Sequence, residues 1–162
     1  MHQFIFLTLV FFPLALLAQQ GLPSNKHFWH TVSTEAPKAA IWQVWTDVAN
    51  WQDWDSGLQS ASLDGAFTAG AKGNIISLEG RKSNFKVVEY VEGESYTFKT
   101  KLPLGALYVK RSFQEVDGKL NFTHEVWFKG ITAGLFAKLF GPNFRAVLPD
   151  VMEQVKQIAE SK

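Results

Sequence analysis

The sequence predicts an α+β domain, in which a strand and a short helical region precede an antiparallel sheet and a long C-terminal helix. Two changes of hydrophobic period predict this class. Apolar residues recur at helical spacing in residues 37–54, at every second position between turn signals in residues 58–130, and at helical spacing again beyond Gly130. A chain of 162 residues is long enough to bury the core of one such domain.

The first strand and two short helices are predicted within residues 28–54. Residues 28–33 alternate as the two faces of a strand do. Pro37 is expected to be the first residue of a helix, because its fixed φ suits that position. Asn50 is expected to cap a second, very short helix. The first helix carries an apolar stripe at the spacing of a buried face, formed by Ile41, Val44, Trp45 and Val48.

Six further strands are predicted between residues 58 and 130, because turn signals divide this region into short runs that alternate in polarity. The turns are expected at Gly65, Gly70–Gly73, Gly80, Glu92–Gly93, Pro103–Gly105 and Asp117–Gly118. Beyond Gly130, a short helix is expected at residues 135–140 and is predicted to end at Gly141–Pro142. A helix of about four turns should follow at residues 144–159.

Two polar residues fall on the predicted inner face of the sheet. A soluble antiparallel sheet buries one side, so the apolar phase of each strand should face the last helix. Arg111 shares that phase with Val109, and His124 shares it with Phe122. His124 could be a core histidine that bonds a carbonyl or a tyrosine hydroxyl, and Arg111 could pair with an acid at the rim. Alternatively, both could donate hydrogen bonds to a ligand in an otherwise apolar pocket.

Three stretches resemble the START-like (SRPBCC) superfamily, and within it the polyketide cyclase/dehydrase-like group. They are EAPKAAIWQVWTDVANWQDWDSGL (35–58), THEVWFKGITAGLFAKLFG (123–141) and LPDVMEQVKQIAE (148–160). The resemblance covers about residues 28 to 160. It implies the helix-grip fold, a curved antiparallel sheet of about seven strands wrapped around a long C-terminal helix, with two short helices after the first strand. It also implies an apolar chamber between sheet and helix.

The candidate ligand-binding residues combine this implied chamber with the strand phases. Trp54 matches the family's bend tryptophan and is a candidate for the chamber wall. A dry chamber of about 300 Å³ would cost about 7 kcal/mol, so we expect it to be small, hydrated or occupied. The candidate ligand-binding residues are Trp54, Phe85, Tyr96, Phe98, Val109, Arg111, Phe122, His124, Phe128, Phe144, Leu148 and Met152.

Three functions are compatible with these observations. The first is extracytoplasmic binding or carriage of a hydrophobic small molecule or lipid, without catalysis. The second is a cyclase- or dehydrase-like enzyme acting on an aromatic or polyketide-type substrate, with His124 as acid/base and Arg111 orienting a carbonyl. The third and weakest is a protein-interaction module, in which Trp29 and Trp127, both on outward strand phases, form an aromatic patch.

Other chemistry finds little support in the sequence. The chain has no cysteine, which excludes thiolate chemistry, and no serine lies in a nucleophile elbow. No metal site or cofactor is predicted; His27 and His30 should point to opposite faces of a strand. The formal net charge of +1 gives no reason to expect a nucleic acid or an anionic membrane as partner. The oligomeric state is left open.

The N-terminal region suggests export. Residues 1–18 contain no charged side chain and include an apolar run of about fifteen residues, which suits a cleaved signal peptide and is short for a membrane span. The expected organisation is a signal peptide at 1–18, a flexible leader at 19–27 and the domain at 28–162. The mature protein would be secreted or periplasmic, without a stable membrane span; an uncleaved N-terminal anchor is the alternative.

Overall fold

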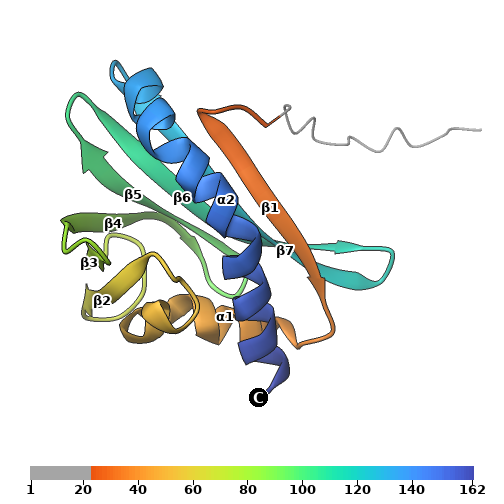
Figure 1. Ribbon diagram of the computed structural model, residues 1–162. Coiled ribbons are helices and arrows are strands. Elements are labelled where there is room, and N and C mark those ends of the chain that lie inside the picture. The colour runs from red at the N-terminus through yellow and green to blue at the C-terminus, as the bar shows by residue number, and fades with distance from the viewer. Residues whose placement is uncertain (1–22) are drawn as a thin grey trace, which may run out of the picture.

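The computed structural model describes residues 23–162, and their main element is one seven-stranded sheet (Figure 1). Its strand order is β1-β7-β6-β5-β4-β3-β2, and every neighbouring pair is antiparallel. The strands are β1 (His27–Thr34), β2 (Leu58–Asp64), β3 (Lys72–Ser77), β4 (Lys82–Val91), β5 (Ser95–Leu102), β6 (Gly105–Val116) and β7 (Lys119–Gly130). The six strands predicted after residue 57 are confirmed.

Helices cover one face of this sheet. The long helix α2 (Ala133–Glu160) crosses in front of the strands, and α1 (Lys38–Thr46) lies near its C-terminal end (Figure 1). The 3-10 helix η1 (Val48–Asp53) follows α1 directly. The stripe predicted on α1 is buried, with Trp45 inaccessible to solvent. The helix-grip fold is therefore confirmed, with two short helices after the first strand.

The structure confirms which side chains of each strand face the core and which face outward. Tyr96 on β5, Arg111 on β6 and His124 on β7 lie opposite one another in register, and all three are buried. The outward phase of Trp29 and Trp127 is also confirmed, and both rings are half-buried. Trp127 stacks on Tyr108 with ring centroids 5.2 Å apart.

The last helix differs from the prediction. Instead of ending at Gly141–Pro142, α2 continues through Pro142 and Pro149 to Glu160. Each proline removes the hydrogen bond that its own amide would donate and crowds the preceding turn, but the turns on either side sustain the helix. Gly141 is also buried, and a Cβ there would lie 2.9 Å from the backbone oxygen of Asn25. The glycine is thus required for close packing rather than for ending the helix.

Smaller corrections concern the two short helices and the leader. Pro37 is the N-cap residue of α1, one position before its first turn. Asn50 lies inside η1, and its side-chain amide donates to the carboxylate of Asp47, the residue that precedes this helix. Within the stretch expected to be a leader, residues 24–27 form a turn, and the backbone oxygen of Lys26 accepts a hydrogen bond from Phe128.

The predicted signal peptide lies outside the described residues. Within residues 23–162, no helix combines the length and the apolar character that a bilayer span requires.

Candidate ligand-binding chamber

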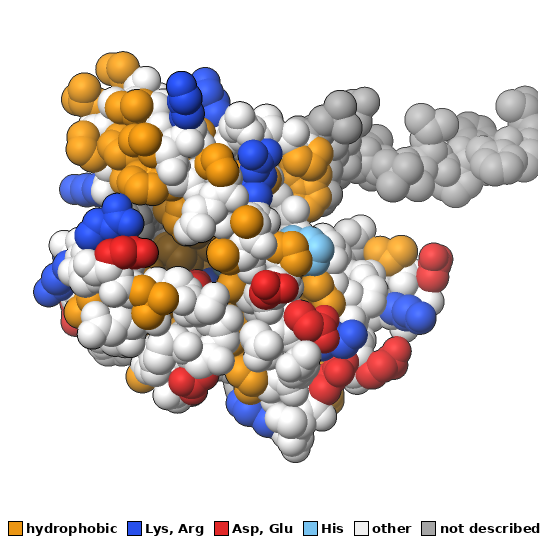
Figure 2. Space-filling model, viewed as in Figure 1, with side chains coloured by type: hydrophobic (Ala, Val, Ile, Leu, Met, Phe, Trp, Pro, Cys, Tyr) orange, Lys and Arg blue, Asp and Glu red, His pale blue; other side chains and the backbone are white. Residues whose placement is uncertain are grey.

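The sheet and the middle of α2 enclose a chamber of about 510 Å³. This volume lies within the usual range of small-molecule sites, roughly 300–1,000 Å³. Its walls come from the segment 51–58, from β3 to β7 and from residues 140–151 of α2, and most of them are apolar. Figure 2 shows a hollow with hydrophobic side chains on its floor, beside α2. The expected chamber is therefore present and opens to solvent.

Part of α2 forms the roof of the chamber, and this part has few side chains packed against the sheet. Residues 142–146 of α2 are all exposed, between the buried residues Gly141 and Leu148. Phe144, Val147 and Leu148 line the chamber from this part of the helix. Five successive exposed residues exceed one helical turn, so this segment spans the opening instead of resting on the sheet.

Arg111 is the dominant polar group of the chamber. Only 2% of its surface is exposed. The guanidinium lies over the rings of Trp51, Trp54, Tyr96 and Phe98, with its central carbon 4.7–5.7 Å from the ring centroids. Aromatic faces attract a cation, and the attraction is larger where water is excluded. This aromatic cage is one reason for the concentration of tryptophan in residues 42–54.

A hydrogen-bonded chain fixes the orientation of the arginine. One terminal nitrogen of Arg111 donates to the Tyr96 hydroxyl at 2.5 Å, and this hydroxyl donates to the backbone oxygen of Trp45 at 2.9 Å. The indole nitrogen of Trp51 donates to the same oxygen at 3.0 Å. Burial raises the pKa of Tyr96, which keeps its hydroxyl protonated.

The charge of Arg111 is not neutralised by a bonded acid. Within residues 23–162, no carboxylate forms an ion pair with Arg111, and its Nε has no hydrogen-bond partner. Asp55, on the chamber wall, is near enough for the charge of Arg111 to influence its pKa. Burial raises the pKa of Asp55, partly offset by its hydrogen bond from Gly57 and by Arg111. A buried cation of this kind is costly without a counter-ion.

His124 is the neighbour of Arg111 across the β6–β7 pair. Burial, and then the charge of Arg111, lower the pKa of His124 well below its usual value, so the ring is neutral near pH 7. Its Nδ1 is buried and has no hydrogen-bond partner among the described residues. No carbonyl or tyrosine hydroxyl among the described residues bonds to this nitrogen, so His124 is not the satisfied core histidine that was one of the two interpretations. His124 as a whole is one of the residues of the chamber wall.

The residues predicted from the sequence divide into two groups. Seven of them line the chamber: Phe98, Val109, Arg111, His124, Phe128, Phe144 and Leu148. The other five are buried in the core beside it: Trp54, Phe85, Tyr96, Phe122 and Met152. Trp54 and Tyr96 still contact Arg111 through their rings. Phe85 packs against Trp51 and Phe98.

Most of the wall residues were not predicted from the sequence, and two of them, Trp51 and Asp55, interact with Arg111. Trp51 lines the chamber where Trp54 was expected, because η1 turns the indole of Trp51 inward. Asp55 was not among the predicted residues, and its place on the wall depends on the bend after η1, which periodicity does not define. No group of three potential metal ligands forms within residues 23–162.

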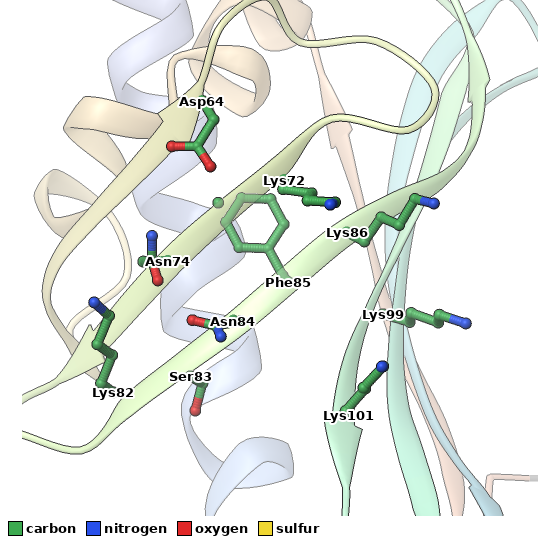
Figure 3. A pocket seen from close by; sticks show the side chains of 11 residues that line it. Asp64, Lys72, Asn74, Lys82, Ser83, Asn84, Phe85, Lys86, Lys99 and Lys101 are labelled. Atoms are coloured by element: carbon green, nitrogen blue, oxygen red, sulfur yellow. The ribbon is translucent and has the colours of Figure 1, made fainter.

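A second hollow, of about 720 Å³, lies on the opposite face of the sheet. Five lysines surround it, on β3, β4 and β5: Lys72, Lys82, Lys86, Lys99 and Lys101 (Figure 3). Lys86 lies directly across the strands from both Lys72 and Lys99. This hollow lacks buried polar groups and an apolar enclosure, so we regard it as the outer curvature of the sheet.

Structural comparisons support the fold. A protein from Nitrosomonas europaea is 11% identical, with a TM-score of 0.65, and the match covers 86% of this chain and 97% of that one. Thalictrum flavum norcoclaurine synthase is 12% identical with a TM-score of 0.64, over 84% and 94% of the two chains. DynU16, from the dynemicin biosynthetic locus, is 16% identical with a TM-score of 0.63, over 85% and 48%.

The family follows from the sequence itself. No curated protein matches this sequence. The family model described as polyketide cyclase / dehydrase and lipid transport matches residues 26–160, nearly the whole described part of the chain. The chain therefore belongs to the polyketide cyclase/dehydrase and lipid transport family of the START-like (SRPBCC) superfamily.

Proposed function

We propose that this protein binds a hydrophobic small molecule or lipid in the chamber, with an acceptor oxygen of the guest against Arg111. The single observation that carries the proposal is the buried guanidinium, whose Nε has no partner and which has no bonded counter-ion within residues 23–162. A carboxylate or polarised carbonyl would supply the missing acceptor, and the neutral ring of His124 can donate a second bond. The apolar walls would hold the remainder of the guest.

The proposal includes an extracytoplasmic location. Its support is the uncharged apolar run in residues 1–18. In that compartment the protein would shield an apolar guest from water.

Two probes that share a ring system test the guest chemistry. Anilinonaphthalene sulfonate and N-phenyl-naphthylamine carry the same fused and phenyl rings, but only the first carries an anion. Arg111→Met should weaken the sulfonate probe about tenfold or more, because hydrogen bonds to a charged group contribute about 1.5–3 kcal/mol. Binding of the uncharged probe should change little.

The pattern of losses separates the explanations. Equal loss of both probes would indicate a damaged chamber, and Arg111→Gln, with thermal unfolding as the folding control, then repeats the comparison. Unchanged binding of both probes in a folded variant would overturn the proposal.

A second candidate function is proton abstraction next to a carbonyl, the first step of a cyclisation or dehydration. The observation that favours it is the meeting of a neutral buried imidazole, a buried cation and a carboxyl of raised pKa in one chamber. Arg111 would polarise the carbonyl and His124 would take the proton. An aryl methyl ketone in heavy water should then gain deuterium with the wild type and not with His124→Phe. Absence of exchange with the wild type removes this candidate.

A further inference from the structure

Exposed apolar side chains gather at one end of the molecule, around the opening of the chamber. We name this surface the apolar tip; it consists of Leu78, Leu104, Ile131, Leu135, Leu139 and Phe144. Their exposed fractions run from 37% for Phe144 to 87% for Ile131. Figure 2 shows hydrophobic side chains grouped at the upper left, over the N-terminal half of α2. Apolar surface this exposed commonly marks an interaction site.

Three elements contribute to the tip as one surface. Leu135 and Leu139 lie one helical turn apart on α2, and Ile131 precedes them by the same spacing. The amide of Ile131 donates to the backbone oxygen of Leu104 at 3.0 Å, which joins the β5–β6 turn to the start of α2. Leu78 and Phe144 line the chamber as well. A guest that leaves the chamber through this opening therefore passes the tip.

The charges beside the tip are almost all positive. Between Gly130 and Pro149 the chain carries Lys138 and Arg145 and no acid. Lys101 and Lys129 are exposed at the adjoining ends of β5 and β7. The acid of this region, Glu79, is paired with Arg81 at 3.3 Å. All the acids of α2 lie beyond residue 149, so positive and negative charges are locally separated although the net charge is only +1.

We propose that the apolar tip docks on the surface of a lipid bilayer that contains anionic phospholipids. The exposed leucines and Ile131 would enter the boundary between headgroups and acyl chains, while Lys138, Arg145, Lys101 and Lys129 meet the headgroups. Docking there places the chamber opening on the medium in which an apolar guest dissolves. The inference depends on the proposed function only in giving docking a role, which is the transfer of the guest. Docking itself needs no guest.

A second copy of the chain fits this surface less well. A symmetric dimer centred on the tip would bring Lys138 and Arg145 close to their own copies, and like charges across an interface are unfavourable. The separation of charge on α2 therefore favours an anionic surface over self-association.

Site-resolved fluorescence in the full chain tests the docking. The chain has no cysteine, so Leu139→Cys and Leu104→Cys each provide a single site for an environment-sensitive NBD label. Val91→Cys and Val116→Cys are matched controls, since both valines are exposed apolar residues at the opposite ends of the strands. Because the label reports its own surroundings, any membrane affinity of residues 1–22 does not determine the result.

With vesicles of phosphatidylglycerol and phosphatidylcholine, labels at 139 and 104 should brighten several-fold and shift to the blue, and those at 91 and 116 should not. Phosphatidylcholine alone should give a much weaker response. Lys138→Gln and Arg145→Gln should each reduce vesicle affinity about fivefold, and added salt should do the same.

Three results would overturn the inference. They are no response at the tip, an equal response at the control sites, and a response that follows protein concentration without vesicles, which would indicate a second copy. The probe binding that depends on Arg111 is measured without vesicles, so this inference and the proposed function fail separately.

Discussion

The two halves of α2 have the same secondary structure and different roles. From Leu148 to Ala159 the helix buries a continuous stripe against the sheet and α1: Leu148, Val151, Met152, Val155 and Ala159. From Ala133 to Val147 it leaves Leu135, Leu139 and Phe144 exposed and contains Pro142. The C-terminal half therefore completes the core, with Leu148 and Val151 also on the chamber wall, while the N-terminal half covers the rest of the chamber. Stability and ligand access depend mainly, but not exclusively, on different parts of a single helix.

The largest expected effect is a loss of stability confined to the C-terminal half. Met152 is fully buried, so Met152→Ala should lower the free energy of unfolding by about 2–5 kcal/mol. The same truncation at the exposed Leu139 should change it by about 0.5 kcal/mol or less. Urea unfolding of both variants measures the difference. Similar losses at the two positions would mean that the halves do not differ as described.

The next effect concerns Pro142, which lies in the covering half. Alanine there restores an amide that can donate within the helix and removes the steric conflict, so Pro142→Ala should raise stability by up to about 3 kcal/mol. Exchange of the naphthylamine probe should become slower, because the roof of the chamber is stiffer. Pro149→Ala is the matched control, with a gain in stability but a smaller effect on exchange. A less stable Pro142→Ala protein would contradict this account of the roof.

The pH dependence of stability tests whether His124 is held neutral in the chamber between α2 and the sheet. In the unfolded chain His124 takes up a proton near its usual pKa of 6.5, whereas its pKa in the folded protein is lower because of burial and Arg111. The unfolded state then binds more protons, so this contribution to stability is full above about pH 6.5 and decreases as the pH falls toward the folded pKa.

The variant His124→Phe should lack that part of the pH dependence. Urea midpoints at about pH 7.5 and about pH 5 provide the measurement, and contributions from other groups cancel in the comparison with the wild type. Parallel changes in both proteins would show that His124 is not held neutral in the folded state.

The smallest expected effect is at the apolar tip. Leu135→Ser should leave the free energy of unfolding within about 0.5 kcal/mol of the wild type, because 57% of Leu135 is already exposed. Vesicle binding of the same variant should weaken, and binding of the anionic probe should not. A marked loss of stability would show that the covering half contributes to the core after all.

The strands and their faces could be predicted because alternation along a strand is a local property. It placed Arg111 and His124 on the inner face, and the register makes them direct cross-strand neighbours. The continuity of α2 could not be predicted, since the proline signal is local whereas the packing of Gly141 against Asn25 joins distant segments. The place of Asp55 on the chamber wall likewise depends on how η1 meets the sheet.

Five of the twelve predicted residues pack in the core beside the chamber instead of lining it. An inward phase does not distinguish a side chain that faces a cavity from one that packs beneath it. Phe122 and Met152 are inward and fully buried, and neither reaches the chamber. The difference depends on where α2 rests on the sheet and where it spans the opening.

A crystal structure of the protein with anilinonaphthalene sulfonate tests the central claim most directly. The account predicts the aromatic rings among Phe98, Val109 and Leu148, with a sulfonate oxygen within hydrogen-bonding distance of Arg111. Probe bound only among Lys72, Lys86 and Lys99 on the outer face, with the chamber closed by side chains, would contradict it.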